Sequence, residues 1–523
     1  MQSVSARTLP EILEETSGRL ADKIAIEDGS NSLTFRELKA AVDQAAAAFI
    51  AADVRPGDKV GIWGPNSAHW IVAALGAQSA GAAIVPLNTR LKGREAGDIL
   101  RRSRARVLCY SGRFLQIDFN NLLADEPLPD LTHRIEMSSP SWDDWLARSL
   151  GRHHEQVMAR RARLQPHDIA DVMFTSGTTG RPKGVMSSHG QNLRVFREWS
   201  GILGLNQQDR YLIVNPFFHA FGYKAGWLSC LITGATILPM AIFDAAEVIR
   251  RIADDRVSVL PGPPTLFQSM LNHPALDQTR TASLRLAVTG AANVPTSLIE
   301  RMHTELGFRT VITGYGLTES TGTVSMCRPG DDAETIARSC GAPLPGIQVK
   351  LVDERGDEVP VGAEGEIWVK GYNVMQGYLD DPIATAATID QDGWLHTGDI
   401  GTQDARGYLR ITDRKKDMFI VGGFNCYPAE IESLMSAHHG VAQVAVVGVA
   451  DERLGEVPAA FVVVKPGVTI STDELIRWCR DNMANYKVPR QVYFVGALPT
   501  TASGKVQKFA LRAGPDSPPA SVT

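Results

Sequence analysis

Short runs of Val, Ile and Leu alternate along the first two thirds of the chain with longer stretches in which apolar residues recur at helical spacing. Residues 60–63 predict a strand, residues 67–79 a helix, and residues 83–87 the next strand. The same pattern predicts further strands at 172–174, 211–214, 235–238, 257–260 and 284–288. Strands that alternate with helices favour parallel sheets covered by helices.

The pattern changes after about Pro343, where short apolar runs are separated by turn-rich segments. The runs at 349–352, 366–370 and 408–411 predict a small antiparallel sheet or a β-barrel-like subdomain. A charged cluster at 413–417 comes next. Beyond it, about a hundred residues have an α+β pattern of their own: a helix at 428–436, strands at 444–449 and 459–464, and a helix at 472–483.

These patterns together predict an α/β protein with a large N-terminal domain and a small C-terminal domain. We place the large domain at residues 1–412, a hinge at 413–416 and the small domain at 417–513. The Pro- and Ser-rich tail, residues 514–523, is predicted to be disordered.

Composition excludes several classes of protein. Hydrophobic residues make up 44% and charged residues 21% of the chain, which is typical of a globular protein. Its 53 basic and 58 acidic residues give a net charge of −5, so no basic surplus favours nucleic acid. The six cysteines are far apart and form no Cys-x-x-Cys pair, which indicates neither a disulfide framework nor a zinc site. With three glutamates in residues 1–19 and no long apolar run, a cytoplasmic location is expected.

The segment that follows the predicted strand ending at Phe174 is rich in hydroxyl groups and glycine. It reads Thr-Ser-Gly-Thr-Thr-Gly-Arg-Pro-Lys-Gly from 175 to 184. Glycines allow several backbone N–H groups to point at one anion, and the lysine adds a positive charge. The spacing differs from the G-x-x-x-x-G-K-[ST] phosphate loop, which weakens a kinase or ATPase interpretation.

The ten-residue loop strongly resembles the signature of the adenylate-forming superfamily, which includes acyl-CoA synthetases, peptide-synthetase adenylation domains and firefly-type luciferases. Further motifs of that superfamily follow in the expected order between Leu33 and Lys505. The resemblance implies that ATP is bound by Thr175, Ser176, Gly177, Thr178, Thr179, Gly180 and Lys183. It also makes Thr179 a candidate ligand of Mg²⁺.

Three other motifs have chemistry that suits a nucleotide. An aromatic ring can stack on adenine, and a glutamate beside a hydroxyl can hold Mg²⁺. By resemblance, Tyr315 contacts adenine, Thr318 contacts phosphate and Glu319 holds the metal. The small residues Gly290, Ala291 and Ala292 are expected to border the adenine and the acyl carboxylate. The carboxylate of Asp399 is expected to bind the ribose hydroxyls, and Arg414 the ribose or a phosphate.

The resemblance further implies a C-terminal domain that moves. Lys416 is the expected pivot, and Lys505 the catalytic cation that stabilises charge during attack on the α-phosphorus. Gly422, Gly423 and Phe424 are expected to line the tunnel for the phosphopantetheine arm of CoA. His219 is expected to gate an acyl pocket that also contains Phe221, Tyr223, Gly262 and Gly314.

The implied activity is ATP-dependent ligation of a carboxylic acid to CoA through an acyl-adenylate, with Mg²⁺ and without nucleic acid or a transmembrane segment. Segments 215–219, 221–226, 259–265 and 326–329 resemble actinobacterial ligases for the indane-propionate left from steroid rings C and D. Fatty acids remain open as substrates. A homodimer remains open as the oligomeric state. An acyl-AMP ligase that loads a carrier protein is the main alternative, and an oxygen-using luciferase is another.

Overall fold

The computed structural model describes residues 6–149, 151, 153–175, 181–290, 294–353, 355–414, 419–426, 428–499, 506 and 508–512. Contacts divide the chain into two compact units, which we describe separately. The first unit comprises Met1–Thr89, Gly97–Phe174 and Gly184–Asp413, and the second comprises Arg90–Ala96, Thr175–Lys183 and Arg414–Thr523. The predicted tail and residues 415–416 of the predicted hinge lie outside the described residues, so the domain limits remain predictions.

A nine-stranded sheet forms one layer of the first unit. Its six central strands are parallel, and antiparallel strands flank them at both edges. In spatial order the strands are β17 (Ala342–Pro343), β16 (Ser325–Met326), β15 (Thr310–Tyr315), β14 (Leu286–Gly290), β13 (Val259–Pro261), β11 (Arg210–Ile213), β12 (Thr236–Pro239), β1 (Ile24–Asp28) and β2 (Asn31–Thr34). Strands β11, β12, β13 and β14 are almost wholly buried, in keeping with their largely apolar sequences, whereas β1 is buried only at Ala25 and Ile26.

A seven-stranded sheet forms a second layer of this unit, and its central pairings are also parallel. In spatial order its strands are β20 (Gly377–Tyr378), β10 (Lys183–Ser188), β9 (Ile169–Thr175), β4 (Ala83–Leu87), β3 (Lys59–Trp63), β5 (Ala105–Tyr110) and β8 (His133–Glu136).

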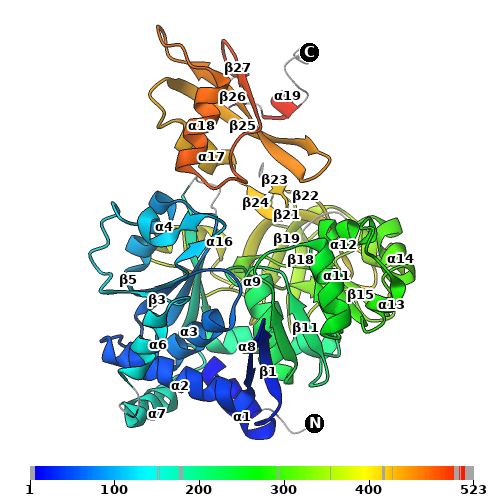
Figure 1. Cartoon of the computed structure of the whole chain (residues 1–523). Helices are drawn as coiled ribbons and strands as arrows, with labels where there is room; N and C mark the ends of the chain where they lie inside the picture. Colours follow the sequence, from blue (N-terminus) through cyan, green and yellow to red (C-terminus); the bar gives the residue numbers. More distant parts are fainter. Residues whose placement is uncertain are drawn as a thin grey trace. The chain divides into compact units, whose positions relative to one another are not determined.

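Helices link the strands and cover both sheets. In Figure 1, helices α11, α12, α13 and α14 gather beside β11 and β15, whereas α1, α2 and α3 lie near β1. The helices up to the small sheet are α1 (Leu9–Arg19), α2 (Phe35–Ala51), α3 (Ala68–Ser79), α4 (Gly93–Ser103), α5 (Phe119–Leu122), α6 (Pro140–Ala147), α7 (His154–Arg163), α8 (His189–Ile202), α9 (Ala220–Gly222), the π-helical turn η1 (Tyr223–Leu228), α10 (Ser229–Thr233), α11 (Ala245–Asp254), α12 (Pro264–Leu271), α13 (Gln278–Thr281), α14 (Thr296–Thr304), the 3₁₀ turn η2 (Thr318–Ser320) and α15 (Ala333–Arg338).

The first unit ends with a four-stranded sheet, in which β18 pairs with β19 and β19 with β21 in antiparallel fashion. Its strands are β18 (Gln348–Val352), β19 (Gly365–Lys370), β21 (Leu395–Gln403) and β22 (Leu409–Arg414), and α16 (Pro382–Thr388) lies between β20 and β21 in the chain. A short hairpin of β6 (Arg113–Phe114) and β7 (Ile117–Asp118) completes the described strands of this unit.

The second unit has a five-stranded sheet and a hydrophobic core of its own. Its strands are β23 (Phe419–Val421), β24 (Phe424–Cys426), β25 (Val441–Asp451), β26 (Gly455–Val464) and β27 (Gln491–Phe494), and its helices are α17 (Pro428–Met435), α18 (Thr472–Asn482) and α19 (Lys508–Arg512). Because Ile431, Met435, Leu475 and Cys479 are fully buried, α17 and α18 each turn an apolar face into this core.

The predicted architecture of helix-covered parallel sheets followed by a smaller α+β unit is confirmed, but the four-stranded sheet includes β21, which the apolar pattern did not predict, and the ends of several helices and strands differ. The strand predicted at 235–238 begins one residue later, because the N–H of Ala235 bonds to the carbonyl of Cys230 and still belongs to the end of α10. The strand predicted at 257–260 begins at Val259, because the N–H of Val257 bonds to Ile252 in α11.

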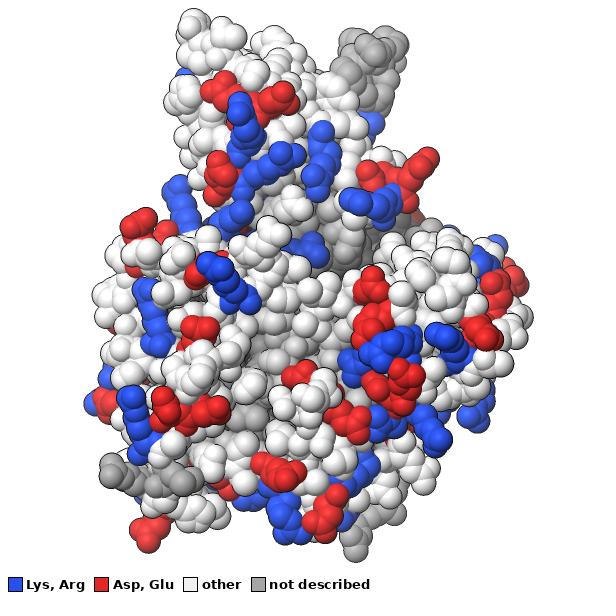
Figure 2. All heavy atoms as spheres, viewed as in Figure 1, with Lys and Arg blue, Asp and Glu red and all other residues white. Residues whose placement is uncertain are grey.

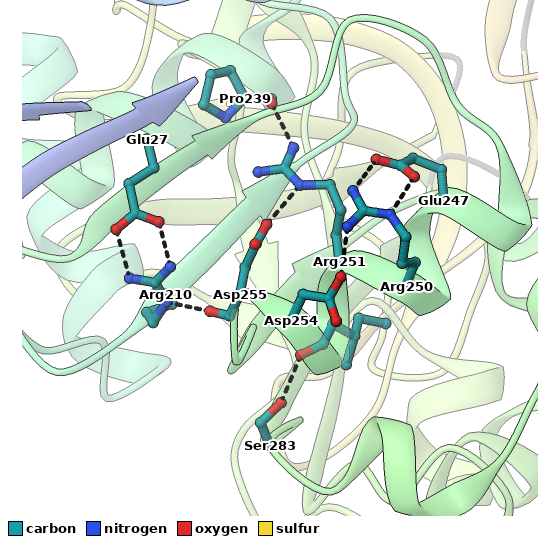
Figure 3. A network of polar contacts seen from close by, with 10 residues as sticks. Glu27, Arg210, Pro239, Glu247, Arg250, Arg251, Asp254, Asp255 and Ser283 are labelled. Carbon is teal, nitrogen blue, oxygen red and sulfur yellow. Dashed lines mark hydrogen bonds and ion pairs between the residues drawn. The ribbon is translucent and has the colours of Figure 1, made fainter. Parts of the chain in front are cut away.

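Many charged side chains of the first unit form ion pairs with one another. Figure 3 shows Arg210 of β11 bound to Glu27 of β1 through two hydrogen bonds, of 3.1 and 2.5 Å. Arg251 of α11 contacts Asp255 at 2.7 Å and the carbonyl oxygen of Pro239 at 2.8 Å. Acidic and basic side chains also lie close together over much of the face in Figure 2, which fits the small net charge. Within the described part of the chain, no helix has the length and apolar content needed to cross a membrane.

A buried histidine makes the stability of the first unit depend on pH. His189 is 1% exposed, and its Nδ1 accepts the N–H of Leu9 at 3.3 Å. Burial lowers the pKa of His189 from 6.5 to about 4. The unfolded chain therefore binds the extra proton between pH 6.5 and pH 4, and the unfolding free energy falls by about 3 kcal/mol over that range.

The variant His189→Asn keeps an acceptor for Leu9 but does not titrate. We expect its unfolding free energy, measured by urea denaturation, to fall by about 3 kcal/mol less than that of the wild type between pH 6.5 and 4. An equal fall in unfolding free energy in the wild type and in His189→Asn would contradict the role of His189 in this pH dependence.

Candidate functional site

The predicted site residues of the nine-stranded sheet follow four strands that are neighbours in space. The loop to His219 follows β11, Gly262 follows β13, Gly290 ends β14, and the segment from Gly314 to Glu319 includes the end of β15. Because these strands are parallel and in register, with Gly290 opposite Gly314, their carboxyl ends share one edge. Ligands of open α/β sheets bind at such an edge.

Tyr315 and Asp399 lie far apart in the sequence but are in direct contact. The hydroxyl of Tyr315 donates a hydrogen bond of 2.6 Å to Oδ2 of Asp399, and the two residues are 8% and 6% exposed. The turn before Asp399 is fixed by the hydroxyl of Thr397, which accepts its N–H and donates to Ile367 at 2.6 Å. The contact joins the predicted adenine residue to the predicted ribose residue.

Glu319 is held from a third part of the chain. The hydroxyl of Tyr378 donates to Oε1 of Glu319 at 3.0 Å, and the N–H of Met375 donates to its carbonyl oxygen at 2.9 Å. Glu319 and Thr318 belong to η2 and are both half-buried. No group of three or more His, Cys, Asp or Glu that could hold a metal occurs among the described residues. A single carboxylate nevertheless fits Mg²⁺, which commonly takes one or two carboxylates and completes its shell with water and phosphate oxygens.

The loop that leads to His219 is clamped by one buried side chain, Asn66, which is 6% exposed. Its Oδ1 accepts the N–H of Phe217 at 2.7 Å, and its Nδ2 donates to the carbonyls of Ile213 and Asn215 at 3.1 and 2.9 Å. Since backbone groups of a loop need partners wherever water is excluded, this clamp fixes the path of the chain into α9.

His219 caps α9, and its ring Nδ1 accepts the N–H of Phe221 at 3.3 Å. The side chain of His219 is exposed. Because Nδ1 accepts this hydrogen bond, the neutral form of the ring carries its proton on Nε2. Phe221 is half-buried and Gly262 is buried. Tyr223 is fully buried and stacks on Trp227 at 4.7 Å, so in this structure it supports the predicted acyl-pocket wall from within the core.

The second unit contains other predicted residues. Gly422 and Gly423 form the turn between β23 and β24 with φ of +53° and +87°, which favours glycine, and Phe424 stacks on Tyr486 at 4.8 Å. Thr175 ends β9 and Lys183 begins β10, so they flank the predicted phosphate loop. The following predicted residues lie outside the described residues: Ser176, Gly177, Thr178, Thr179, Gly180, Ala291, Ala292, Lys416 and Lys505. Of Arg414, only the backbone is described, at the end of β22.

Sequence reasoning missed the residues that hold the predicted ones in place. Neither Tyr378 nor Asn66 is part of the motifs described above, and each acts on a segment at least 59 residues away. No periodicity or spacing in the sequence could have connected them, because only the folded chain brings their partners within reach.

Comparisons with known proteins identify the family of the chain. Residues 13–379 match the family model described as AMP-binding enzyme, and residues 430–505 match the AMP-binding enzyme C-terminal domain. A 3-[(3aS,4S,7aS)-7a-methyl-1,5-dioxo-octahydro-1H-inden-4-yl]propanoyl:CoA ligase from Rhodococcus jostii is 48% identical, with 97% of this chain and 98% of the relative covered. A ligase of the same name from Mycobacterium tuberculosis is 49% identical, with the same coverage.

A solved structure shares the whole fold. A variant of o-succinylbenzoate CoA synthetase from Bacillus subtilis, bound to a product analogue, has a TM-score of 0.81 and 29% identity, and the match covers 96% of this chain and 98% of that one. The fold and the motifs at the sheet edge thus define an adenylate-forming ligase. The chain belongs to the AMP-binding enzyme family, as an AMP-forming acid–thiol ligase whose substrates are a carboxylic acid, ATP and CoA.

The turn before α9 leads to a prediction about Gly222. A Cβ atom at this position would lie far inside van der Waals contact with the carbonyl oxygens of Asn215 and Pro216. We expect Gly222→Ala to lower the unfolding free energy by roughly 1–3 kcal/mol because backbone must move. The matched control is Gly201→Ala in α8, where an added Cβ meets nothing within 4 Å. We expect this variant to raise the unfolding free energy by up to about 1 kcal/mol, because alanine favours the helix more than glycine does. Urea denaturation measures both, and equal effects would contradict the steric account.

Proposed function

We propose that the carboxylic acid is a bicyclic, steroid-derived propionate. The observation that carries this proposal is the 48–49% identity, over nearly the full length of both chains, to two ligases named for such an acid. A fused-ring acid is broad and rigid, so it needs a pocket whose walls are fixed. The Asn66 clamp and the cap at His219 provide a fixed loop at the edge where the acid is expected.

The chemistry proceeds in two steps at one site. A carboxylate oxygen of the acid attacks the α-phosphorus of ATP, and the bond to pyrophosphate breaks. The thiol of CoA, losing its proton, then attacks the acyl carbon and displaces AMP. The products are acyl-CoA, AMP and pyrophosphate, so no oxidant or covalent enzyme intermediate is needed.

In this scheme, the adenylate is bound beside the Tyr315–Asp399 contact, with adenine against the tyrosine and ribose on the carboxylate. The hydrogen bond from Tyr378 orients the Glu319 carboxylate that would hold Mg²⁺, an ion that neutralises phosphate charge when bound. Lys505 is proposed to stabilise the charge that develops on the α-phosphate, with Lys416 as the pivot of the C-terminal segment. Since ATP and CoA are cytoplasmic metabolites, we propose a cytoplasmic location.

A substrate screen tests the acid. The substrates are the indane-propionate with two ring ketones, octanoate and palmitate, and the measured quantities are AMP release with and without CoA. We expect kcat/KM for the bicyclic acid to exceed that for either fatty acid by about 100-fold or more, because a pocket shaped for fused rings leaves a linear chain poorly packed. We also expect sustained AMP release only with CoA.

Preference for a fatty acid would overturn the proposed substrate while leaving the ligase class intact. Efficient transfer to a carrier protein, with no stimulation by CoA, would instead support the acyl-AMP ligase.

Lys505→Ala tests the separation of the two steps. We expect pyrophosphate release to fall by about 10²–10³-fold, because the missing cation stabilises charge that builds up only in the transition state. Thioester formation from supplied acyl-adenylate should stay within about threefold of wild type. An equal loss in both steps would contradict the role of Lys505.

Gly423→Leu tests the CoA side, with Gly467→Leu as its matched control. Both glycines have positive φ, +87° and +77°, and both face open space, so leucine causes similar backbone strain. We expect Gly423→Leu to release pyrophosphate normally but to form thioester at least about tenfold more slowly, whereas Gly467→Leu should do both normally. Normal thioester formation by Gly423→Leu would exclude the tunnel.

A further inference from the structure

A fully buried ion pair lies behind the predicted acyl-pocket wall. Nζ of Lys224, in η1, is 3.0 Å from Oδ1 of Asp171, in β9, and both side chains have 0% exposure. Removing two charges from water is costly, and a buried pair is often no more stabilising than two apolar side chains of similar volume. Stability alone therefore gives no reason for a lysine and an aspartate here.

Each member of the pair has a second partner. Nζ of Lys224 donates to the hydroxyl of Ser187 at 3.0 Å, and Nδ2 of Asn192 donates to the other oxygen of Asp171 at 2.6 Å. Ser187 belongs to β10 and Asn192 to α8. These hydrogen bonds therefore fix the orientation of both the Lys224 ammonium and the Asp171 carboxylate.

A second link joins η1 to β9, through the residue that precedes each member of the ion pair. Nε2 of Gln78, in α3, donates both to the hydroxyl of Tyr223 at 3.0 Å and to the carbonyl oxygen of Ala170 at 3.1 Å. Residues 223 and 224 are thus tied to residues 170 and 171. Any slip of η1 along β9 would break both links, so they fix the register between the segments.

The backbone of η1 also requires such support. At Gly226 the chain leaves helical geometry, with φ −89° and ψ −105°. The carbonyl oxygen of Lys224 accepts the hydroxyl of Ser229, and that of Ala225 accepts the hydroxyl of Tyr211, both at 3.0 Å. Short π-helical segments inside helices occur frequently at functional sites.

The position of the pair connects two predicted parts of the site. Lys224 is two residues beyond α9, the helix that His219 caps, and Asp171 is four residues before Thr175, where the predicted phosphate loop begins. We propose that Asp171 and Lys224 are positioning residues that hold the wall of the acyl pocket in register with the strand leading into the phosphate loop, and so set the preference for broad over narrow acids. This inference rests on the proposed location of the acyl pocket.

The test compares Lys224→Met with the double variant Asp171→Leu/Lys224→Met. The measured quantity is the ratio of kcat/KM for the bicyclic propionate to that for octanoate. Since both constants come from one preparation, the ratio does not change when part of the enzyme is unfolded. We expect the ratio to fall at least tenfold in both variants, with the KM for ATP within about threefold of wild type. The double variant should regain the thermal stability lost in Lys224→Met, because no unpaired carboxylate stays buried.

Arg161→Met is the matched control. Arg161 is another buried cation of the first unit, 5% exposed, and it contacts Asp43 of α2 and Glu14 of α1 at 2.5 and 3.1 Å. We expect the variant Arg161→Met to lose thermal stability without changing the ratio of the two kcat/KM values. The proposal is overturned by an unchanged ratio in the double variant or by an equal fall in Arg161→Met. If the wild type rejects the bicyclic acid, the proposed substrate fails by itself, and the ratio is measured with the broadest and narrowest acids it accepts.

Discussion

The parallel register of β11, β13, β14 and β15 is the constraint on which the rest of the first unit depends. Parallel strands need a crossover between each pair, so every strand ends at the same edge and every return helix lies on a face. The segments that follow these four strands therefore meet at one edge, although they are spread over about a hundred residues. A change of direction in any one of these strands would remove its segment from the site.

Residues that meet at an edge still need a defined orientation, and hydrogen bonds from distant segments provide it. Tyr315 is joined to Asp399, Glu319 is joined to Tyr378, and Asn66 holds the loop before His219. The partners come from the small sheet, from β20 and from the turn after β3. Groups that are oriented before a substrate arrives need little reorganisation during the reaction, which is how polar sites stabilise developing charge.

The two steps of the proposed ligase reaction make different demands on the second unit. Adenylation needs a cation near the α-phosphate, whereas thioester formation needs a narrow path for a thiol. The second unit contains the Gly422–Gly423 turn, and its sequence includes Lys505. In the proposed mechanism, the second unit serves both steps by presenting different segments in turn, a gating motion of the kind that limits the rate of many enzymes.

The sequence by itself determined the class of fold and the chemistry of the motifs. Local patterns are enough for this, since a short apolar run such as Leu286–Val288 between polar segments favours a buried strand, and a Gly- and Thr-rich loop after a strand suits phosphate. Only the tertiary structure decided which residues support the site. The contacts of Tyr378 with Glu319, and of Lys224 with Asp171, join positions more than 50 residues apart that share no motif. Such pairs depend on the packing of separate elements, which no local pattern specifies.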